Sequence, residues 1–414
     1  MADGTMMTEE SMTERLPAYV FDLPVQELRR GYRSDVYFWR EKVALEKNGL
    51  HPSVTMQVFQ KRQVVLCGTD EAIAVLKLAS GHYRDRRRAY ELFDRFLELK
   101  RGSRKVFLLD RDLYLKTIEE KNRLSGELDR LWESDYDGLK IESLFDGEAV
   151  SPWETVMHIT GDAAAFAHLE TIYLGVLARR TRIATNVRRI VAAAQGKMVL
   201  YFPARFDHWA VQGGDGYAAQ IGGAGGVSTD AQAEWWGGKG GGTVPHALIA
   251  AVGGDTVQAV TLFGEAFPDE RLVALVDFDN DSVRTALECA RALGPRLWGV
   301  RLDTSENMVD QSIFADMGSF RPTGVVPELV CKTRAALDRE GFQHVRIVVS
   351  GGFNPEKIAE FESLKTPADA YGVGSALLQG VYDFTADIVR VDGQPCAKAG
   401  RKYRPNARLQ PVVS

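Results

Sequence analysis

Short apolar runs alternate with amphipathic segments along the C-terminal part of the chain. From about residue 165 onward, each run precedes a polar or glycine-rich turn and then a segment whose apolar residues recur at helical spacing. Strands that alternate with helices of about 10–15 residues predict parallel βα units, arranged as a barrel or as an open α/β sheet. The runs are MVLYFPAR, LVALVDFD, LWGVRLDTSEN, VRIVVSGGFN and DAYGVGSALL.

The N-terminal third mixes the two kinds of pattern. VTMQVFQK alternates as a strand does, whereas DEAIAVLKLASG has helical spacing and ends at a glycine. Residues 84–137 are densely charged, and their apolar positions recur at helical spacing, which predicts two exposed helices. The plainest interpretation of this charge is a solvated face.

Composition restricts the classes of protein that fit. The 414 residues are 45% hydrophobic and 26% charged, as in ordinary globular proteins, and the net charge of −5 argues against nucleic acid or anionic membrane as a bulk partner. The four cysteines are scattered without a CxxC pair, so we expect free thiols in a reducing compartment. The acidic N-terminus does not resemble a signal peptide, and no apolar run of about 20 residues predicts a membrane span. We therefore expect a cytoplasmic protein.

Two glycine-rich segments do not match nucleotide-binding fingerprints. GGDGYAAQIGGAGG lacks the strand that precedes a dinucleotide-binding turn, and GGKGGGT lacks the spacing of a phosphate-binding P-loop. These glycines therefore need another explanation.

Polar residues and glycines stand where several predicted strands end. In barrels the loops at the carboxyl ends of the strands form the active site, and the last two loops often bind phosphate. Bare glycine backbone lets amide groups approach an anion, and a following helix N-terminus adds a positive dipole. One glycine turn alone has the alternative of a simple tight turn, but two on consecutive strands favour phosphate binding. The residues at these ends are Asp277, Arg301, Asp303, Ser350, Gly351, Gly352, Gly372, Gly374 and Ser375.

Asp277 and Asp303 place two carboxylates at the same predicted edge. Pointed into one pocket they would repel each other, so we expect a cation between them: Arg301, Mg²⁺ or a charged histidine. The alternative is that each carboxylate caps a helix at a strand–helix junction.

Aromatic residues stand at the start of one predicted helix and at the end of one predicted strand. SDVYF contains Tyr37 and Phe38, and YFPAR contains Phe202. Core packing is the usual role of such side chains, and the alternative is a flat ligand stacked between two rings.

Nine motifs in order along the chain together resemble the nicotinate phosphoribosyltransferase family, which belongs to the type II phosphoribosyltransferases. The motifs are RRGYRSDVYF, LETIYLG, FPARFDH, IGGAGGVS, GTVPHAL, VRLDT, VSGGFNPEKI, YGVGSAL and VDGQPCAKAGRKYRPN. The resemblance implies an α/β fold: an N-terminal α/β sandwich domain over residues 1–163, with a charged helical insertion at about 84–137, and an irregular α/β barrel of parallel βα units over residues 164–383. Residues 384–414 would form a tail packed on the N-terminal domain. The resemblance also implies a head-to-tail homodimer with a shared active site.

The resemblance assigns roles to the residues at the strand ends. His246, in GTVPHAL, matches the histidine that ATP phosphorylates, and Asp277 matches the carboxylate that hydrogen-bonds its ring. Arg301 and Asp303 match residues at the ribose and base site, so these four form the expected catalytic set. The loops that hold the 5′-phosphate match Ser350, Gly351, Gly352, Gly372, Gly374 and Ser375.

The base and the diphosphate have their own matches in the resemblance. Phe202 matches one of two rings around the pyridine, and Tyr37, with Asp35 in the same motif, is expected from the other subunit. Arg205 matches the arginine that faces the carboxyl or amide group, and Ser228 stands where nicotinamide-using relatives have aspartate, which would repel a carboxylate. The residues matched to diphosphate binding are Lys398, Arg401 and Lys402, with a solvated basic tail as the alternative.

The resemblance implies transfer of a phosphoribosyl group from 5-phosphoribosyl-1-pyrophosphate to nicotinate, coupled to ATP hydrolysis through phosphorylated His246, with Mg²⁺ and ATP as cofactors. FPARFD departs from the family's Phe-Gly-x-Arg-Arg: Phe206 replaces the second arginine, and Asp207 follows it. If the second arginine helps bind the carboxylate, nicotinate recognition is weakened here, and Asp230, two residues beyond Ser228, could change the ring pocket, of which Asp207 is also an expected member. Open alternatives are a transferase of the same fold for nicotinamide or another ring, and a non-catalytic nucleotide-binding relative. No metal ligand is assigned. A Schiff-base aldolase is disfavoured because no lysine ends a predicted strand.

Overall fold

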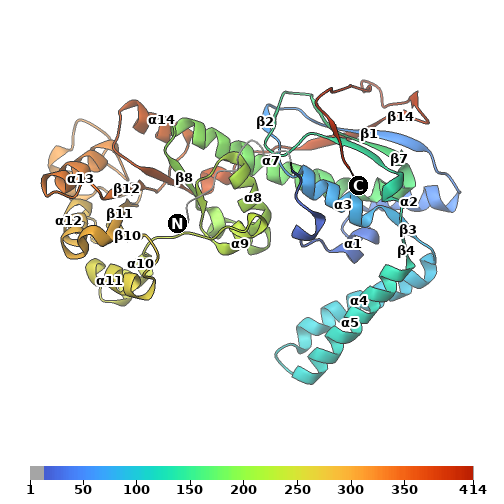
Figure 1. Cartoon of the computed structure of the whole chain (residues 1–414), viewed down its shortest axis with the longest axis horizontal. Helices are drawn as coiled ribbons and strands as arrows, with labels where there is room; N and C mark the ends of the chain where they lie inside the picture. Colours follow the sequence, from blue (N-terminus) through green and yellow to red (C-terminus); the bar gives the residue numbers. More distant parts are fainter. Residues whose placement is uncertain (1–13, 414) are drawn as a thin grey trace. The chain divides into compact units, whose positions relative to one another are not determined.

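A computed structural model describes residues 14–413, which divide into two compact units (Figure 1). The first unit consists of residues 14–179 and 382–413, and the second is Arg180–Val381. The sequence-based boundaries, at 163/164 and 383/384, stay predictions. In this part of the chain no helix combines the length and apolarity that a bilayer span needs.

The first unit is built on a six-stranded antiparallel sheet. In spatial order its strands are β15 (Gln394–Pro395), β14 (Phe384–Val391), β1 (Ser53–Gln60), β7 (Thr155–Asp162), β5 (Lys140–Ser143) and β16 (Gln410–Pro411). Two small ribbons accompany it: β2 (Val64–Val65) with β6 (Ala149–Val150), and β3 (Gly81–Tyr83) with β4 (Trp132–Ser134). The runs VTMQVFQK and DEAIAVLKLASG form β1 and a helix, as their patterns predict.

Helices supply much of the core of the first unit. Val54, Met56 and Val58 of β1 belong to one apolar cluster with Ile73 and Tyr173 of two helices. The C-terminal segment also contacts the sheet, because Gln57 of β1 hydrogen-bonds the backbone of residues 402 and 404. The helices are α1 (Val25–Arg29), α2 (Val36–Lys47), α3 (Thr69–Ala79), α6 (Ala163–Phe166) and α7 (Glu170–Ala193), with 3₁₀ turns η2 (Ala18–Val20), η3 (Tyr136–Gly138) and η4 (Ala167–Leu169).

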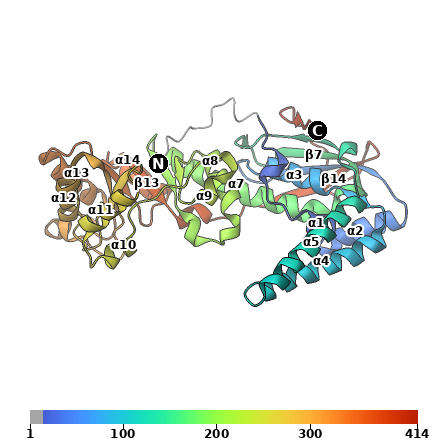
Figure 2. The same ribbon diagram turned by 60° about the horizontal axis from the view of Figure 1, so that its bottom comes forward.

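The charged stretch at 84–137 forms a helical hairpin of α4 (Arg86–Val106) and α5 (Arg111–Leu131) (Figure 2). Each helix begins at an aspartate N-cap, Asp85 and Asp110, whose side chains accept backbone N–H bonds. The hairpin has a small core of its own, with Phe93 and Leu128 buried. The two helices expected from the spacing are therefore present, and most of their charged side chains are exposed, although Lys100 and Arg86 pair with Glu27 and Glu46.

The second unit contains a six-stranded parallel sheet. Its strands, in spatial order, are β10 (Leu272–Leu275), β11 (Leu297–Leu302), β12 (Arg346–Val349), β13 (Ala370–Val373), β8 (Met198–Tyr201) and β9 (Gly226–Val227). In this order β10 and β9 are the two edge strands and do not pair with each other. The curled sheet is therefore an open half-barrel. The α/β fold class expected from the alternating pattern is confirmed.

Helices and turns connect these parallel strands (Figure 1). The helices are α8 (Gln212–Gly222), α9 (Asp230–Ala233), α10 (His246–Ala251), α11 (Thr256–Ala266), α12 (Ser282–Leu293), α13 (Pro327–Arg339) and α14 (Pro355–Ser363). The 3₁₀ turns are η5 (Pro203–Phe206), η6 (Trp209–Val211), η7 (Glu234–Trp236), η8 (Gly294–Arg296), η9 (Gln311–Asp316) and η10 (Ser375–Leu378). Because the strands are parallel, their carboxyl ends lie at one edge of the sheet, and the polar residues of the sequence motifs gather there.

Candidate functional site

A cavity of about 560 Å³ lies at the carboxyl ends of the parallel strands, within the second unit. Most of the residues that the sequence assigns to the site line this cavity. They are Phe202, Arg205, Ser228, His246, Arg301, Asp303, Ser350, Gly351, Gly352, Gly372, Gly374 and Ser375. These residues come from separate strand ends and loops, so the fold brings together what the chain separates by up to about 170 positions.

Arg301, Asp303 and Ser350 form a closed hydrogen-bonded triangle at the ends of β11 and β12. Arg301 Nη2 donates to Asp303 Oδ2 (2.7 Å) and Arg301 Nε to Ser350 Oγ (2.8 Å). Ser350 Oγ in turn donates to Asp303 Oδ1 (2.6 Å). Charge-assisted hydrogen bonds of this length hold the Arg301 guanidinium and the Asp303 carboxylate in one orientation. The cation expected beside Asp303 is therefore Arg301.

His246 pairs with the second carboxylate. It is the first residue of α10, and its Nε2 lies 3.1 Å from both Oδ1 and Oδ2 of Asp277. The Asp277 side chain is 8% exposed, whereas the histidine side chain is 45% exposed. The hydrogen bond to Asp277 raises the pKa of His246, and partial burial opposes the rise. The ring is thus held at Nε2 and accessible from the cavity.

The glycine turn after β12 adopts a backbone that other residues rarely tolerate. Gly351 and Gly352 have φ angles of +87° and +65°, in the left-handed region. Lys357 of α14 donates from Nζ to the Gly351 carbonyl (3.3 Å), which anchors the turn from behind. The Glu306 side chain occupies the place where a Cβ atom on Gly352 would stand, and the phosphate role of this turn stays a prediction.

The glycines of the next loop lie under aromatic rings. A Cβ atom placed on Gly372 would stand 2.6 Å from Phe202 Cε2, and one on Gly374 would stand 2.7 Å from Phe206 Cε2. These positions therefore exclude a side chain because rings occupy the space, which is a reason for glycine that the sequence pattern did not reveal.

The residues that the resemblance matches to base binding differ in whether they line the cavity. Arg205 and Ser228 line the cavity, and Ser228 donates from both N and Oγ to Gln232 Oε1 (3.0 and 3.1 Å). Asp207 and Asp230 are not among its lining residues. The Asp207 carboxylate accepts the His208 N–H (2.7 Å), and that of Asp230 accepts the Gly240 N–H (2.9 Å). The influence of these two aspartates on the ring pocket stays a prediction.

Thr243 and Phe206 belong to the site but were not assigned to it from the sequence. Thr243 Oγ1 accepts a hydrogen bond from Arg301 Nη1 (3.0 Å), and both residues line the cavity. Thr243 could have been identified from the sequence, because it is a hydroxyl residue in the glycine-rich segment three residues before His246. Phe206 was noted only as a missing arginine.

Asp35 and Tyr37 lie on the first unit, at the start of α2. Tyr37 is 62% exposed, and its ring centroid is 4.2 Å from that of Phe38. Asp35 Oδ2 accepts a hydrogen bond from Thr171 Oγ1 (2.9 Å). The exposed ring is available to a partner or ligand, and its place at a shared active site stays a prediction.

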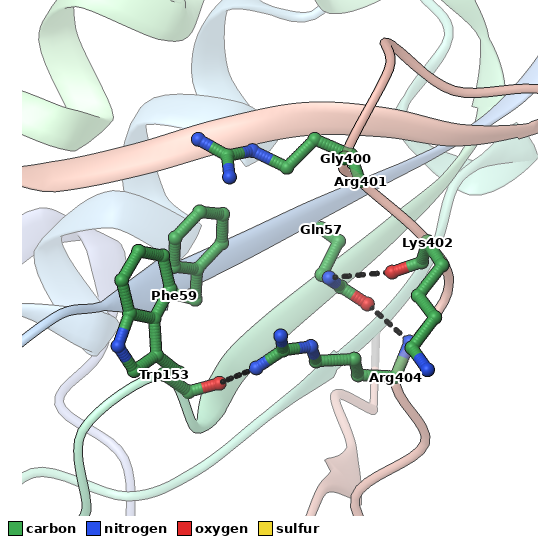
Figure 3. Close-up of a pocket in the computed structure, with 7 residues that line it drawn as sticks. All are labelled: Gln57, Phe59, Trp153, Gly400, Arg401, Lys402 and Arg404. Atoms are coloured by element: carbon green, nitrogen blue, oxygen red, sulfur yellow. Dashed lines mark hydrogen bonds between the residues drawn. The ribbon is translucent and has the colours of Figure 1, made fainter.

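The basic tail also lies on the first unit, where Arg401 and Lys402 line a small separate hollow with Trp153 (Figure 3). Arg401 Nε donates to Asp387 Oδ2 (2.7 Å), so one cation is already paired. Lys398 is not among the residues of the hollow. The expected binding of diphosphate by these three residues stays a prediction.

Potential metal ligands do not cluster in the part of the chain that the structure describes. Within residues 14–413, no group of three or more histidine, cysteine or acidic side chains has a geometry that could hold a metal ion. Cysteine is present at four of the described positions, of which Cys67 and Cys289 are buried and Cys331 and Cys396 are exposed.

Comparison with known proteins gives consistent results. The chain is similar to nicotinate phosphoribosyltransferase pncB1 of Mycobacterium tuberculosis, with 30% identity over 281 residues, which is 65% of this chain and 58% of that relative. The chain therefore spans less than two thirds of this curated relative's length. No family model matches the sequence.

Solved structures extend the similarity to most of the chain. The crystal structure of nicotinate-nucleotide pyrophosphorylase from Pyrococcus furiosus has 31% identity and a TM-score of 0.69, and the match covers 95% of this chain and 85% of that one. Human nicotinic acid phosphoribosyltransferase, with 17% identity, a TM-score of 0.61 and coverage of 89% and 77%, shares the fold. The chain belongs to the nicotinate phosphoribosyltransferase family.

Proposed function

We propose that this protein transfers the phosphoribosyl group of 5-phosphoribosyl-1-pyrophosphate to nicotinate, giving nicotinate mononucleotide and pyrophosphate in NAD biosynthesis. The observation that supports the proposal is the single cavity in which the Arg301–Asp303–Ser350 triangle, the His246–Asp277 pair and two glycine loops meet. We further propose a cytoplasmic homodimer in which Tyr37 of one subunit completes the site of the other.

The transfer itself needs no protein nucleophile. The bond from ribose C1 to the diphosphate oxygen breaks with its electron pair leaving on the diphosphate, and the lone pair of the pyridine nitrogen forms the new bond to C1. Positive charge builds on the ribose during this exchange, and the half-buried Asp303 carboxylate is suited to stabilise it. Mg²⁺ would arrive bound to the substrate's diphosphate, because Mg²⁺ in proteins is commonly shared with substrate phosphates.

ATP coupling would use His246. Asp277 holds Nε2, which leaves Nδ1 to accept the γ-phosphoryl group of ATP as the bond to ADP breaks. Water then takes the phosphoryl group, so one ATP becomes ADP and phosphate in each cycle. Substitution of His246 by alanine should leave weak transfer but abolish its stimulation by ATP. A variant that keeps the full ATP-dependent rate would remove the phosphohistidine from the proposal.

Nicotinamide is a second candidate base. Phe206 stands where the family motif has an arginine, so Arg205 is the remaining cation of that motif that can face a carboxylate. The purified protein should be incubated with the phosphoribosyl donor, Mg²⁺, ATP and a panel of pyridine carboxylates and amides, with pyrophosphate release measured for each. Fastest release with nicotinate is expected. Faster release with an amide would select the second candidate, and no release with any base would favour a non-catalytic nucleotide-binding protein.

A further inference from the structure

The segment after β8 folds over the end of β13. The Phe202 N–H donates to the Val373 carbonyl (2.9 Å), and η5 then turns across the loop that follows β13. Gly372 lies in β13 and Gly374 follows the strand, and a Cβ atom on either glycine would meet an aromatic ring of this segment. The two aromatic residues of FPARF, Phe202 and Phe206, are seated on these two glycines.

The two rings differ in how they are held. Phe202 is half-buried, and the Arg301 guanidinium lies 5.5 Å from its ring centroid. Phe206 is 49% exposed although it lines the cavity, so about half of its side chain faces solvent, and the Arg205 guanidinium, 5.4 Å from its ring centroid, is itself an exposed group. Its ring nevertheless lies against Gly374, at 2.7 Å from the point where a Cβ would stand.

We propose that Phe206 is a movable cover of the phosphate subsite, whose ring competes with a ligand phosphate for the surface of Gly374. A phosphate group binds such a loop by placing its oxygens against bare backbone. A ring carbon and a phosphate oxygen cannot occupy the same space, so the ring has to swing aside before the phosphate makes full contact. The proposal rests on the phosphate role of this loop in the proposed function.

A cover of this kind weakens the apparent affinity for phosphate. If the uncovered conformation holds about a tenth of the population, the apparent dissociation constant is about tenfold larger than that of an open loop. Removing the ring should therefore tighten phosphate binding, which is the opposite of what happens when a contact residue of the ligand is removed. Tighter phosphate binding after removal of the ring would thus indicate that Phe206 covers the loop, whereas weaker binding would indicate that Phe206 contacts the bound phosphate.

The experiment compares Phe206→Ala and Phe206→Tyr with the unmodified protein. Binding of inorganic phosphate is measured by titration calorimetry at one fixed salt concentration. We expect Phe206→Ala to bind phosphate about three- to tenfold more tightly and Phe206→Tyr, which keeps the ring, to bind as the unmodified protein does. Trp209→Ala is the matched control, because Trp209 is an exposed aromatic residue of the same segment that does not line the cavity.

Unchanged or weaker phosphate binding by Phe206→Ala would overturn the proposal that Phe206 covers the loop. An absence of phosphate binding in the unmodified protein and in every variant would overturn it as well. Where the transferase assay gives activity, the KM for the phosphoribosyl donor should fall in Phe206→Ala in parallel with the dissociation constant. A protein without transferase activity whose alanine variant still binds phosphate more tightly would refute the proposed function and leave the cover in place. The two proposals therefore fail separately.

Discussion

At the scale of single residues, Arg301, Asp303 and His246 of the cavity are already paired with other side chains. Arg301 donates to Asp303, Ser350 and Thr243, and His246 is paired with Asp277. Groups fixed in this way need little reorganisation when charge develops on a reacting substrate, which is the main electrostatic contribution that enzymes make. The hydrogen-bond partners of the charged residues should therefore matter as much as the charges.

Substitution of Arg301 by lysine tests this argument. A lysine keeps the charge, but it cannot reproduce the planar set of donors that reaches three partners at once. We expect kcat/KM for phosphoribosyl transfer to fall by about 10- to 100-fold. Thr243→Val is the control that removes one partner of Arg301 and should have a smaller effect. Full activity in Arg301→Lys would show that charge alone is sufficient.

The pH dependence of ATP stimulation follows from the His246–Asp277 pair. The hydrogen bond raises the pKa of His246, so the ring stays protonated to a higher pH than a free histidine does. A protonated Nδ1 cannot accept a phosphoryl group, so ATP stimulation should increase with pH through this raised pKa. Asp277→Asn removes the cause of the rise and should move the midpoint to lower pH. The measurement is the ATP-dependent part of the rate from about pH 6 to about pH 9. A midpoint that stays in place would contradict the pairing.

At the scale of elements, the sequence predicts those features that depend on neighbouring residues, such as a strand followed by a glycine turn. VRIVVSGGFN predicts a buried strand followed by a glycine turn, and it forms β12 and the turn at Gly351 and Gly352. The contact between Phe206 and Gly374 could not be predicted, because it joins residues 168 positions apart and depends on how η5 crosses β13. Nor could the pattern reveal that Asp230 bonds the Gly240 N–H and does not face the cavity. Local spacing predicts elements, whereas these contacts arise from packing.

The α4–α5 hairpin offers an element-scale prediction. Phe93 is 2% exposed in the hairpin's own small core, whereas Leu108 at its tip is 88% exposed. Phe93→Ala should destabilise the hairpin by about 3–5 kcal/mol, because a buried phenylalanine leaves a cavity when truncated. Leu108→Ala is the matched control and should change stability by less than about 0.5 kcal/mol. Hydrogen exchange of the amides of residues 86–131 measures the difference. Equal protection in both variants would mean that the hairpin does not depend on this core.

At the scale of the whole molecule, the residues that the resemblance assigns to the site are divided between the two units. The second unit contains the cavity with His246, Arg301 and Asp303, whereas Asp35 and Tyr37 belong to the first. Each unit has its own sheet and core, so each can hold its site residues without the other. In a homodimer with shared sites, Tyr37 of one subunit would lie at the cavity of the other subunit. This arrangement can be tested by complementation between two inactive variants.

Mixing two inactive variants tests the shared site. Tyr37→Ala removes the ring proposed to reach the partner's cavity, and Asp303→Asn disables the cavity itself. In a dimer with sites shared between subunits, equal amounts of the two variants form hybrids in which one site has both substitutions and the other has neither. Random exchange of subunits should restore about a quarter of the unmodified activity, measured as pyrophosphate release. Each variant mixed with itself is the control and should stay inactive. No recovery in a mixture shown by mass to contain hybrids would place Tyr37 and Asp303 in the same site of one chain, whereas activity of Tyr37→Ala by itself would remove Tyr37 from the site.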